Sequence, residues 1–226
     1  MSTTTTIAIA GQKGGVGKTT VAIALAAEWL QRGKQVLLVD ADPQKTATTW
    51  VEVATEHKRP VPTLVGMGAT MWKSDQLPRL APGFDVVIID TPPRLGDVQR
   101  AALMVADVVV LPCGPSAHDC WALAEGLELI NQAATMRPAL RSCVLLTRKV
   151  GGTVIGREAR DVLGGTGLPV LKIELGYRTD YQEASAAGQG SSTYKPTSVA
   201  AVETRAFVDE LETFAGMRRP MKAVRA

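Results

Sequence analysis

The chain has 226 residues, of which 46% are hydrophobic, 21% are charged and only 4% are aromatic. This composition excludes a disordered chain, and the length predicts one domain with a core of Ala, Val, Ile and Leu. The 3 cysteines include no CxxC pair, and His57 and His118 lie far apart, which argues against a disulfide framework or a zinc site. There is no basic stretch before an apolar N-terminal run, and no apolar run of about 18 residues, so we expect a soluble, cytoplasmic protein.

Positive charge is concentrated at the C-terminus. The chain carries 25 Lys and Arg against 22 Asp and Glu, and 4 of the basic residues lie in the last ten positions: Arg218, Arg219, Lys222 and Arg225. We therefore expect a single domain over residues 1–216, which holds 21 basic and 22 acidic residues, followed by a short basic tail over residues 217–226. A cationic tail can attract phosphates, although a solvated, frayed terminus is the more common meaning.

Short apolar runs alternate with longer segments of helical period from one end of the chain to the other. The sequence predicts strands over residues 6–10, 35–39, 63–65, 84–89, 107–112, 142–147 and 168–173. It predicts helices over residues 19–32, 46–57, 98–105, 117–135, 154–163 and 198–214. Strands such as VLLV and VVII are apolar on both faces, so the pattern indicates a doubly wound α/β domain, a mostly parallel sheet with helices on both faces. Residues 188–195 (GQGSSTYK) are predicted to form a surface loop.

The most specific motif is the run QKGGVGKTT, which begins at Gln12 directly after the first predicted strand. A strand, a glycine-rich loop, Lys-Thr and a helix are together typical of a phosphate-binding P-loop. Glycines let successive N–H groups point at phosphate oxygens, and the helix adds its positive dipole end. Lys18 would neutralise the β- and γ-phosphates, and the Thr19 hydroxyl would bind Mg²⁺. We expect nucleotide contacts from Lys13, Gly14, Gly15, Val16, Gly17, Lys18, Thr19 and Thr20.

A dinucleotide-binding Rossmann site is the competing interpretation of this loop. Gly15 and Gly17 have the spacing of its first two glycines, and Asp40 ends the next strand, where a ribose-binding acid could lie. Lys18 argues against it, because a pyrophosphate turn has no use for a lysine whereas a triphosphate site needs that charge. We therefore expect ATP and Mg²⁺ as the cofactors.

Two positions distinguish the loop from the general pattern GxxxxGK[ST]: Gln12 replaces the first glycine, and a second lysine, Lys13, follows it. In these respects the loop resembles the deviant Walker A family of P-loop NTPases, and it is similar to the ParA branch of chromosome and plasmid partition ATPases. The resemblance implies that Lys13 reaches across a homodimer interface to the phosphates of the partner's ATP. Taken alone, Lys13 could also be a solvent-exposed loop lysine.

Acidic residues end two of the predicted strands: Asp40 and Asp42 follow VLLV, and Asp90 ends FDVVIID. The carboxyl ends of parallel strands meet at one edge of a sheet, so these acids are expected near the P-loop. The first stretch resembles the family's DxDPQ motif, which implies that Asp40 positions the attacking water. Asp42 precedes Pro43 and is equally compatible with a helix N-cap. Asp90 has the place of a Walker B carboxylate that holds Mg²⁺ through a water.

The segment after the second acidic strand end is similar to the family's DTPP switch, which senses the γ-phosphate; it comprises Asp90, Thr91, Pro92 and Pro93. Arg94 follows, and we interpret it as a solvated arginine rather than a charge that acts on a partner.

Three weaker similarities lie further along the chain. Residues 115–121 are similar to the family's PSxxDxW segment, and residues 178–188 have the spacing RxxYxxAxxxG. Arg148 lies in a stretch that resembles the strand end near the adenine base.

The resemblance implies a small ATP hydrolase of the ParA type, without a DNA-reading domain ahead of its P-loop. It would form a homodimer when ATP is bound, with Lys13, Lys18 and Asp40 as the catalytic residues. A small adaptor or activator protein would stimulate its slow hydrolysis, and the cargo would be a plasmid, a chromosome region or a protein organelle such as a carboxysome. The expected location is cytoplasmic and nucleoid-associated, with no membrane.

The resemblance also implies that the dimer binds duplex DNA without sequence preference. The body of the chain has almost no net charge, so local basic clusters must supply the phosphate contacts. The candidates are Lys195, Arg205, Arg218, Arg219, Lys222 and Arg225.

Two alternative functions remain. A MinD-like membrane-associated positioning ATPase would need an amphipathic C-terminal helix, but the predicted helix over residues 198–214 carries four acids and is more simply a core helix. An iron–sulfur carrier ATPase bridges its cluster between paired cysteines, and no CxxC pair is present.

Overall fold

The computed structural model describes residues 4–94 and 96–217. Its strands are β1 (Thr5–Ile9), β2 (Val36–Asp40), β3 (Thr63–Gly66), β4 (Val86–Asp90), β5 (Val108–Cys113), β6 (Arg141–Lys149) and β7 (Val170–Gly176). Its helices are α1 (Lys18–Gln31), α2 (Thr46–Glu56), α3 (Leu77–Leu80), α4 (Asp97–Val105), α5 (Ala117–Met136), α6 (Val154–Gly164), α7 (Thr179–Ala186), α8 (Ser191–Tyr194) and α9 (Val199–Ala215). Each predicted strand and helix is present, with ends shifted by a few residues.

The strands form one sheet of 7 strands in the order β3-β2-β4-β1-β5-β6-β7, and every neighbouring pair is parallel. The predicted doubly wound α/β fold is therefore confirmed. Because β1 lies between β4 and β5, the chain winds outward from it in both directions. The loops that follow β1, β2 and β4 consequently meet at one edge, where ligands bind in open α/β sheets.

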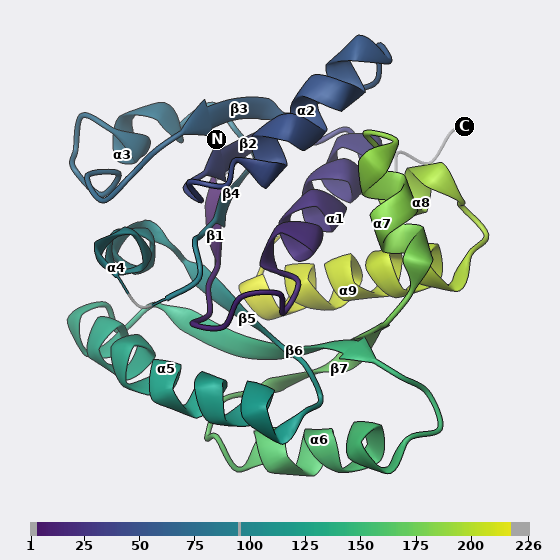
Figure 1. Ribbon diagram of the computed structural model, residues 1–226. Helices are drawn as coiled ribbons and strands as arrows, with labels where there is room; N and C mark the ends of the chain where they lie inside the picture. The colour runs from purple at the N-terminus through teal and green to yellow at the C-terminus, as the bar shows by residue number, and fades with distance from the viewer. Residues whose placement is uncertain (1–3, 95, 218–226) are drawn as a thin grey trace, which may run out of the picture.

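Helices cover both faces of this sheet (Figure 1). One hydrophobic cluster joins the sheet to α1, α2, α7 and α9, and the other joins it to α3, α4, α5 and α6. Ile7 and Ile9 of β1 point into the first cluster, whereas Ala8 and Ala10 point into the second. Burial of alternate residues on opposite faces explains why the central strands are apolar at almost every position.

The segment after α7 differs from its predicted surface loop. Residues 191–194 form the short helix α8, in which Ser191 and Ser192 are 2% and 0% exposed. The Ser191 hydroxyl is hydrogen-bonded to that of Thr204, at 2.7 Å. Gly188 has φ +64°, and a Cβ there would lie 2.6 Å from the backbone N of Ala54. The small residues of this segment therefore allow close packing, so the loop prediction was wrong.

Helix α9 closes the first face as the last core helix. Phe207, Val208 and Leu211 are fully buried on its inner side. No helix within residues 4–94 and 96–217 is long and apolar enough to cross a bilayer.

The outer edge of β7 is covered by side chains. The carboxylate of Glu210 on α9 accepts hydrogen bonds from the N–H groups of Lys172 and Ile173, at 2.7 and 2.8 Å. Arg160 of α6 donates to the carbonyl oxygens of Leu171 and Lys172, both at 2.9 Å. In the middle of this edge strand, backbone groups that would otherwise be exposed are thus paired within the chain.

Candidate functional site

The loop between β1 and α1 has the backbone geometry of a phosphate-binding turn. Gly15 and Gly17 have φ of 74° and 97°, in the left-handed region that favours glycine. Gly17 is the N-cap of α1, so the 14-residue helix begins at Lys18 with its free N–H groups at the loop. This end of a helix attracts anions through its N–H groups and its dipole.

Side chains from the end of β6 hold this loop in place. The Thr147 hydroxyl donates to the Val16 carbonyl at 2.8 Å, and Arg148 Nη1 donates to the Gly15 carbonyl at 2.7 Å. Two loop carbonyls are therefore already paired. The sequence predicts Arg148 at the site but not Thr147, because a threonine at a strand end carries no distinctive pattern.

Lys18 lies inside the loop. Lys18 is only 6% exposed, and its Nζ donates a hydrogen bond to the Lys13 carbonyl at 2.9 Å. Burial lowers the pKa of Lys18, and the neighbouring carboxylates of Asp90 and Asp42 act in the opposite direction. The lysine is thus fixed between the loop backbone and the acids, where it can neutralise a phosphate.

Lys13 is paired within its own chain. Its Nζ binds Oδ1 of Asp119, a residue that is 7% exposed near the start of α5. Asp119 also accepts a hydrogen bond from the Ser116 hydroxyl and closes a capping box with it. Burial raises the pKa of Asp119, but the hydrogen bonds from Lys13 and Ser116 outweigh burial and leave it below its usual value. The segment similar to PSxxDxW therefore caps α5 and holds Lys13.

Asp40 is fully engaged in hydrogen bonds at the end of β2. Oδ2 accepts from both the N–H and the hydroxyl of Thr48, at 2.9 and 2.7 Å, and Oδ1 accepts from the Asp42 N–H at 3.2 Å. Thr48 is in the first turn of α2, so Asp40 caps that helix from the neighbouring strand. The N-cap of α2 is Lys45, and Asp42 instead accepts from the Gln44 N–H in a turn. The N-cap interpretation of Asp42 was therefore wrong.

Asp90 ends β4 directly beside Asp40, its partner in the β2–β4 register. It is 0% exposed, and neither carboxylate oxygen accepts a hydrogen bond from residues 4–94 or 96–217. Burial raises the pKa of Asp90 to about 7; Thr19 and Lys18 lower it, and Asp40 and Asp42 raise it further. A buried carboxylate with free oxygens beside the Thr19 hydroxyl fits the oxygen ligands that Mg²⁺ prefers.

The segment from Asp90 to Arg94 is bonded to β1 and the P-loop. The Thr91 hydroxyl donates to the Ile9 carbonyl at 2.8 Å, and the Arg94 N–H donates to the Gln12 carbonyl at 2.8 Å. The Arg94 side chain is exposed, in agreement with a solvated arginine. A movement of this segment would therefore displace the P-loop backbone at Gln12 or break its hydrogen bond to Arg94.

Gln99 on α4 also connects the two segments, although no motif points to it. It is 1% exposed, and its Nε2 donates to the carbonyls of Gly11 and Pro92, at 3.0 and 2.8 Å. One amide group thus links the start of the P-loop to the DTPP segment. A lone glutamine in a helix has no signature in the sequence, so only the structure reveals it.

A cavity of about 320 Å³ opens beside the P-loop, on the side of β6 and β7. It is lined by Gly15, Gly17, Thr20, Val21, Thr147, Arg148, Leu175, Gly176, Tyr177, Arg178, Tyr181 and Gln182. The guanidinium carbon of Arg148 lies 5.8 Å from the centre of the Tyr177 ring. This volume and lining are those of a small-molecule site, here with an aromatic ring next to the loop.

The segment with the spacing RxxYxxAxxxG forms one wall of this cavity and ties it to α9. Arg178 makes a forked ion pair with Glu203, and the Tyr181 hydroxyl donates to the same carboxylate at 3.1 Å. Ala184 is buried and Gly188 packs on α2. Its residue pattern is therefore explained by packing of α7 against α2 and α9.

The candidate DNA-binding residues have mixed surroundings. Lys195 is paired with Asp180 at 2.9 Å and with Glu183 at 2.8 Å, and Arg205 donates to the Pro196 carbonyl at 2.8 Å. The four tail residues Arg218, Arg219, Lys222 and Arg225 lie outside the described residues.

Similarity to known proteins agrees with this geometry. Residues 7–191 match the profile of the CobQ/CobB/MinD/ParA nucleotide binding domain. The chain belongs to this family. Within it, the named relatives identify a ParA-type member of the ParA/MinD group of ATPases, which act in positioning or partition.

Two curated relatives match most of the chain. "Maintenance of carboxysome distribution protein A" of Halothiobacillus neapolitanus is 32% identical over 185 residues, which are 81% of this chain and 84% of the relative. "Chromosome-partitioning ATPase Soj" of Thermus thermophilus is 32% identical over 91% of this chain and 94% of its own length.

Solved structures of the same fold include a single-residue variant of Cyanothece McdA in complex with ATP. It superposes with a TM-score of 0.77 at 20% identity, over 98% of this chain and 100% of that chain. The septum site-determining protein MinD of Pyrococcus horikoshii with Mg-ADP has a TM-score of 0.75 at 19% identity, over 97% and 100%. These likenesses support the P-loop NTPase fold assigned from β1, the loop and α1.

Proposed function

We propose that this chain is a Mg-ATP-dependent switch that dimerises on ATP, binds DNA without sequence preference and positions a cargo. The observation that carries the proposal is the meeting of Lys18, Thr19, Asp40 and Asp90 at one edge of the sheet, with Lys13 at the rim of the loop. A simple phosphate-binding protein would need the loop and Lys18 alone. The two strand-end acids add what hydrolysis requires.

Each residue has a separate role in the proposed reaction. The loop N–H groups and Lys18 bind the β- and γ-phosphates, and the Thr19 hydroxyl with Asp90 would hold Mg²⁺, Asp90 through a water. The metal, when bound, supplies charge that neutralises the phosphate oxygens. Asp40, anchored by Thr48, orients the attacking water. The Thr91–Pro93 segment senses the γ-phosphate, because it is bonded to the P-loop through Arg94 N–H and Gln99.

The nucleoside is proposed to occupy the 320 Å³ cavity beside the loop. Its base would lie near Arg148 and Tyr177, which extend the loop's binding surface on the side away from Asp40. The neighbouring proteins solved with ATP and Mg-ADP support a nucleotide at this fold position.

Lys13 is proposed to reach the phosphates of a second copy. In the structure it binds Asp119, so dimerisation would exchange this ion pair for a phosphate contact. The side chain is 38% exposed, which leaves it accessible to a partner. A partner protein that acts on the dimer would stimulate hydrolysis and release the DNA. The relatives named for carboxysome distribution and chromosome partitioning support cargo positioning as the role.

Calorimetry with Mg-ATP tests the nucleotide site. Lys18→Ala should abolish measurable ATP binding, because the phosphate charge would lose its buried cation. Lys73→Ala removes an exposed lysine outside the site and serves as the matched control. Unchanged ATP affinity in Lys18→Ala would overturn the assignment.

Sedimentation with a slowly hydrolysed ATP analogue tests the dimer. The parent chain and Lys73→Ala should sediment as dimers and Lys13→Ala as a monomer that still binds the nucleotide. A Lys13→Ala chain that dimerises as well as the parent rules out the contact across the interface.

DNA binding is tested by removing residues 217–226. If the tail bases bind phosphates, the truncated chain should hold duplex DNA more weakly, and its log–log salt slope should fall by about one unit for each phosphate-binding residue removed. ATP hydrolysis should be unchanged. Binding of the truncated chain at the same salt concentration as the parent would move the basic site to the folded domain, with Arg205 as the first residue to test.

A further inference from the structure

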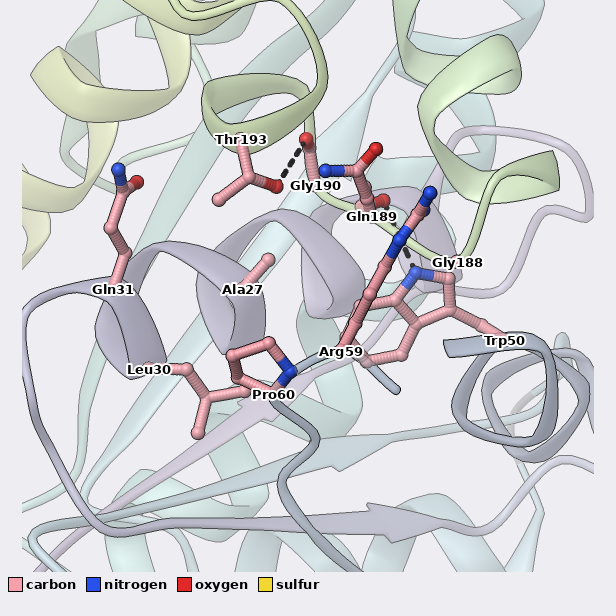
Figure 2. A pocket seen from close by; sticks show the side chains of 10 residues that line it. All are labelled: Ala27, Leu30, Gln31, Trp50, Arg59, Pro60, Gly188, Gln189, Gly190 and Thr193. Carbon is pink, nitrogen blue, oxygen red and sulfur yellow. Dashed lines mark hydrogen bonds between the residues drawn. The ribbon is translucent and has the colours of Figure 1, made fainter. Parts of the chain in front are cut away.

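A second, smaller pocket lies on the same face of the sheet as α1 but well away from the phosphate loop. It is formed by the C-terminal half of α1, by α2 and the residues that follow it, and by the turn before α8 (Figure 2). Its lining residues on α1 begin at Ala27 and extend to Gln31. At a rise of 1.5 Å per residue, Leu30 is roughly 16 Å along the helix from Thr19.

Close backbone packing builds the floor of this pocket. Trp50 Nε1 donates to the Gln189 carbonyl at 3.1 Å, which fixes the indole against the turn. A Cβ at Gly190 would lie 2.4 Å from Ala27 Cβ, and one at Gly188 would meet the backbone of Ala54. The turn is therefore packed closely against α1 and α2 at the pocket, and this packing depends on glycine at two positions.

The size and lining of the pocket suit one apolar side chain. Its volume is about 140 Å³, and its lining includes the apolar side chains of Ala27, Leu30, Trp50 and Pro60. An apolar cavity of about 150 Å³ binds benzene, so a leucine-sized group fits and a nucleotide does not.

Arg59 adds an unpaired cation to this apolar site. Its Nη1 is buried and has no hydrogen-bond partner among the described residues, and no ion pair of its side chain is found there. Figure 2 shows the guanidinium end directed toward the turn that carries Gln189. Because the guanidinium as a whole has no hydrogen bond or ion pair within the described residues, a carboxylate placed beside it would form a charge-assisted hydrogen bond. His57 and Lys58, both exposed, precede Arg59 and add to the positive character of the rim.

We propose that this pocket binds a peptide segment of a partner protein that presents a leucine-like side chain next to an acidic one. The apolar side chain would fill the space beside Trp50, and the carboxylate would bind Arg59. The inference rests on the proposed function, which requires a partner, and it assigns that partner a docking chemistry separate from the ATP site.

The position of the pocket connects it to the acid that is proposed to orient water. Helix α2 carries Trp50 at the pocket and Thr48, two residues earlier, on Asp40. Trp50 also forms part of the wall of a larger cavity that reaches Thr19 and Thr20 of the P-loop. An occupant that presses on the indole would therefore act on the helix that holds Asp40.

The blocked dipeptide acetyl-Leu-Glu-amide is the probe for this site, titrated into the full-length chain labelled with ¹⁵N. The indole N–H signal of Trp50 should shift and saturate, with a dissociation constant of roughly 1 mM for so small a ligand. Acetyl-Leu-Gln-amide, which lacks only the charge, should bind about tenfold more weakly to the same unmutated chain.

Variants locate the charge contact. Arg59→Gln should weaken binding of acetyl-Leu-Glu-amide about tenfold, because the carboxylate would lose its partner. Lys58→Gln removes the same charge one residue away, outside the pocket lining, and should bind within about twofold of the parent since surface charges contribute little. ATP binding should be equal in both variants.

Four outcomes would overturn the inference. The first two are the absence of a saturable shift of the Trp50 signal and equal affinity of the parent chain for the Glu and Gln dipeptides. The other two are equal affinity of Arg59→Gln and the parent for acetyl-Leu-Glu-amide, and equally tight binding of 4-methylpentanoate, which would indicate a small acid as the ligand. Lys18→Ala should bind the dipeptide like the parent. If the dipeptide does not bind but ATP does, the docking inference is wrong and the proposed switch function is unaffected. If the parent chain does not bind ATP, the proposed switch function is itself wrong.

Discussion

Asp40 and Asp90 hold matching positions at the ends of neighbouring parallel strands, yet their carboxylates have opposite surroundings. Asp40 accepts three hydrogen bonds, two of them from Thr48. Asp90 accepts none from the described part of the chain although it is fully buried. Both residues end strands of almost identical composition, so the difference arises from the loops that follow.

One sheet edge thereby provides two kinds of acid. After β2 the chain turns back into α2, whose first N–H groups lie within reach of Asp40 and need an acceptor. After β4 the DTPP segment runs toward the P-loop and offers its hydrogen bonds to Ile9 and Gln12 instead. Asp40 is thus held in one orientation, whereas both oxygens of Asp90 are left without a hydrogen bond from the described residues.

The largest expected effect comes from removing the acid with free oxygens. Asp90→Asn should lower Mg²⁺-dependent ATP turnover about 100-fold or more, because the metal's charge stabilisation is worth several kcal/mol. Nucleotide affinity in Asp90→Asn should become insensitive to Mg²⁺, whereas Asp40→Asn should retain the full Mg²⁺ dependence. Steady-state kinetics and calorimetry with and without the metal measure both effects, and equal Mg²⁺ dependence in the two variants would contradict the division of roles.

Substitutions of Asp40 and Asp90 should also change the free energy of unfolding in opposite directions. Asp40→Ala should lower the free energy of unfolding by about 2–3 kcal/mol, because it leaves the Thr48 and Asp42 N–H groups without their acceptor. Asp90→Asn should raise it by about 1 kcal/mol at pH 8 without metal, because it removes a buried charge whose desolvation outweighs the favourable effect of Thr19 and Lys18. Urea unfolding in EDTA measures both changes. If Asp90→Asn destabilises the chain at pH 8, its carboxylate has partners that the structure does not show.

The gain in the free energy of unfolding from Asp90→Asn should increase as the pH rises. Burial raises the pKa of Asp90 in the folded chain to about 7, above that of an unfolded aspartate near about 4. The parent chain therefore loses stability as pH rises from about 4 through 7, while the variant does not. Unfolding curves of the two proteins should converge toward pH 4, and a difference that persists there would exclude this titration as the cause.

The smallest effect is expected from the residue that holds Asp40. Thr48→Val removes the hydroxyl donor but keeps the backbone N–H bond, so the free energy of unfolding should fall by about 1 kcal/mol. ATP turnover should fall by less than in Asp40→Asn, since the carboxylate remains. Thr49→Val, on the exposed side of the same helix, is the matched control. Equal turnover in Thr48→Val and the parent would show that the hydroxyl does not orient Asp40.

Sequence patterns predict what local chemistry dictates and miss what depends on tertiary packing. The glycine-rich loop, Lys18, Asp40 and Asp90 are evident because each follows a strand with a clear apolar run. Gln99 escapes notice because a single amide acquires its role only when α4 lies across Gly11 and Pro92. The residues over 188–195 are small and polar, which favours a loop prediction, whereas in the structure their smallness serves close packing against α1 and α2.

Lys13 marks a second limit of sequence reasoning. The resemblance to partition ATPases implies a contact with another subunit, but nothing local predicts that Asp119, more than a hundred positions away, binds it in the same chain. Ser116 and Asp119 are recognisable in the sequence only as part of a weaker similarity. Their capping box follows from the start of α5, and the ion pair follows from where the sheet places that helix.

The hydrogen bonds of Glu210 and Arg160 to the edge of β7 affect how copies of the chain can associate with one another. The proposed function would bring many copies together on DNA, and at high local concentration exposed strand edges tend to join into continuous sheets between molecules. Glu210 and Arg160 occupy backbone groups of Leu171, Lys172 and Ile173 in the middle of β7, and the opposite edge, β3, offers only 4 residues. Assembly through strand addition is thereby disfavoured, and many copies can lie next to one another while each remains free to dissociate.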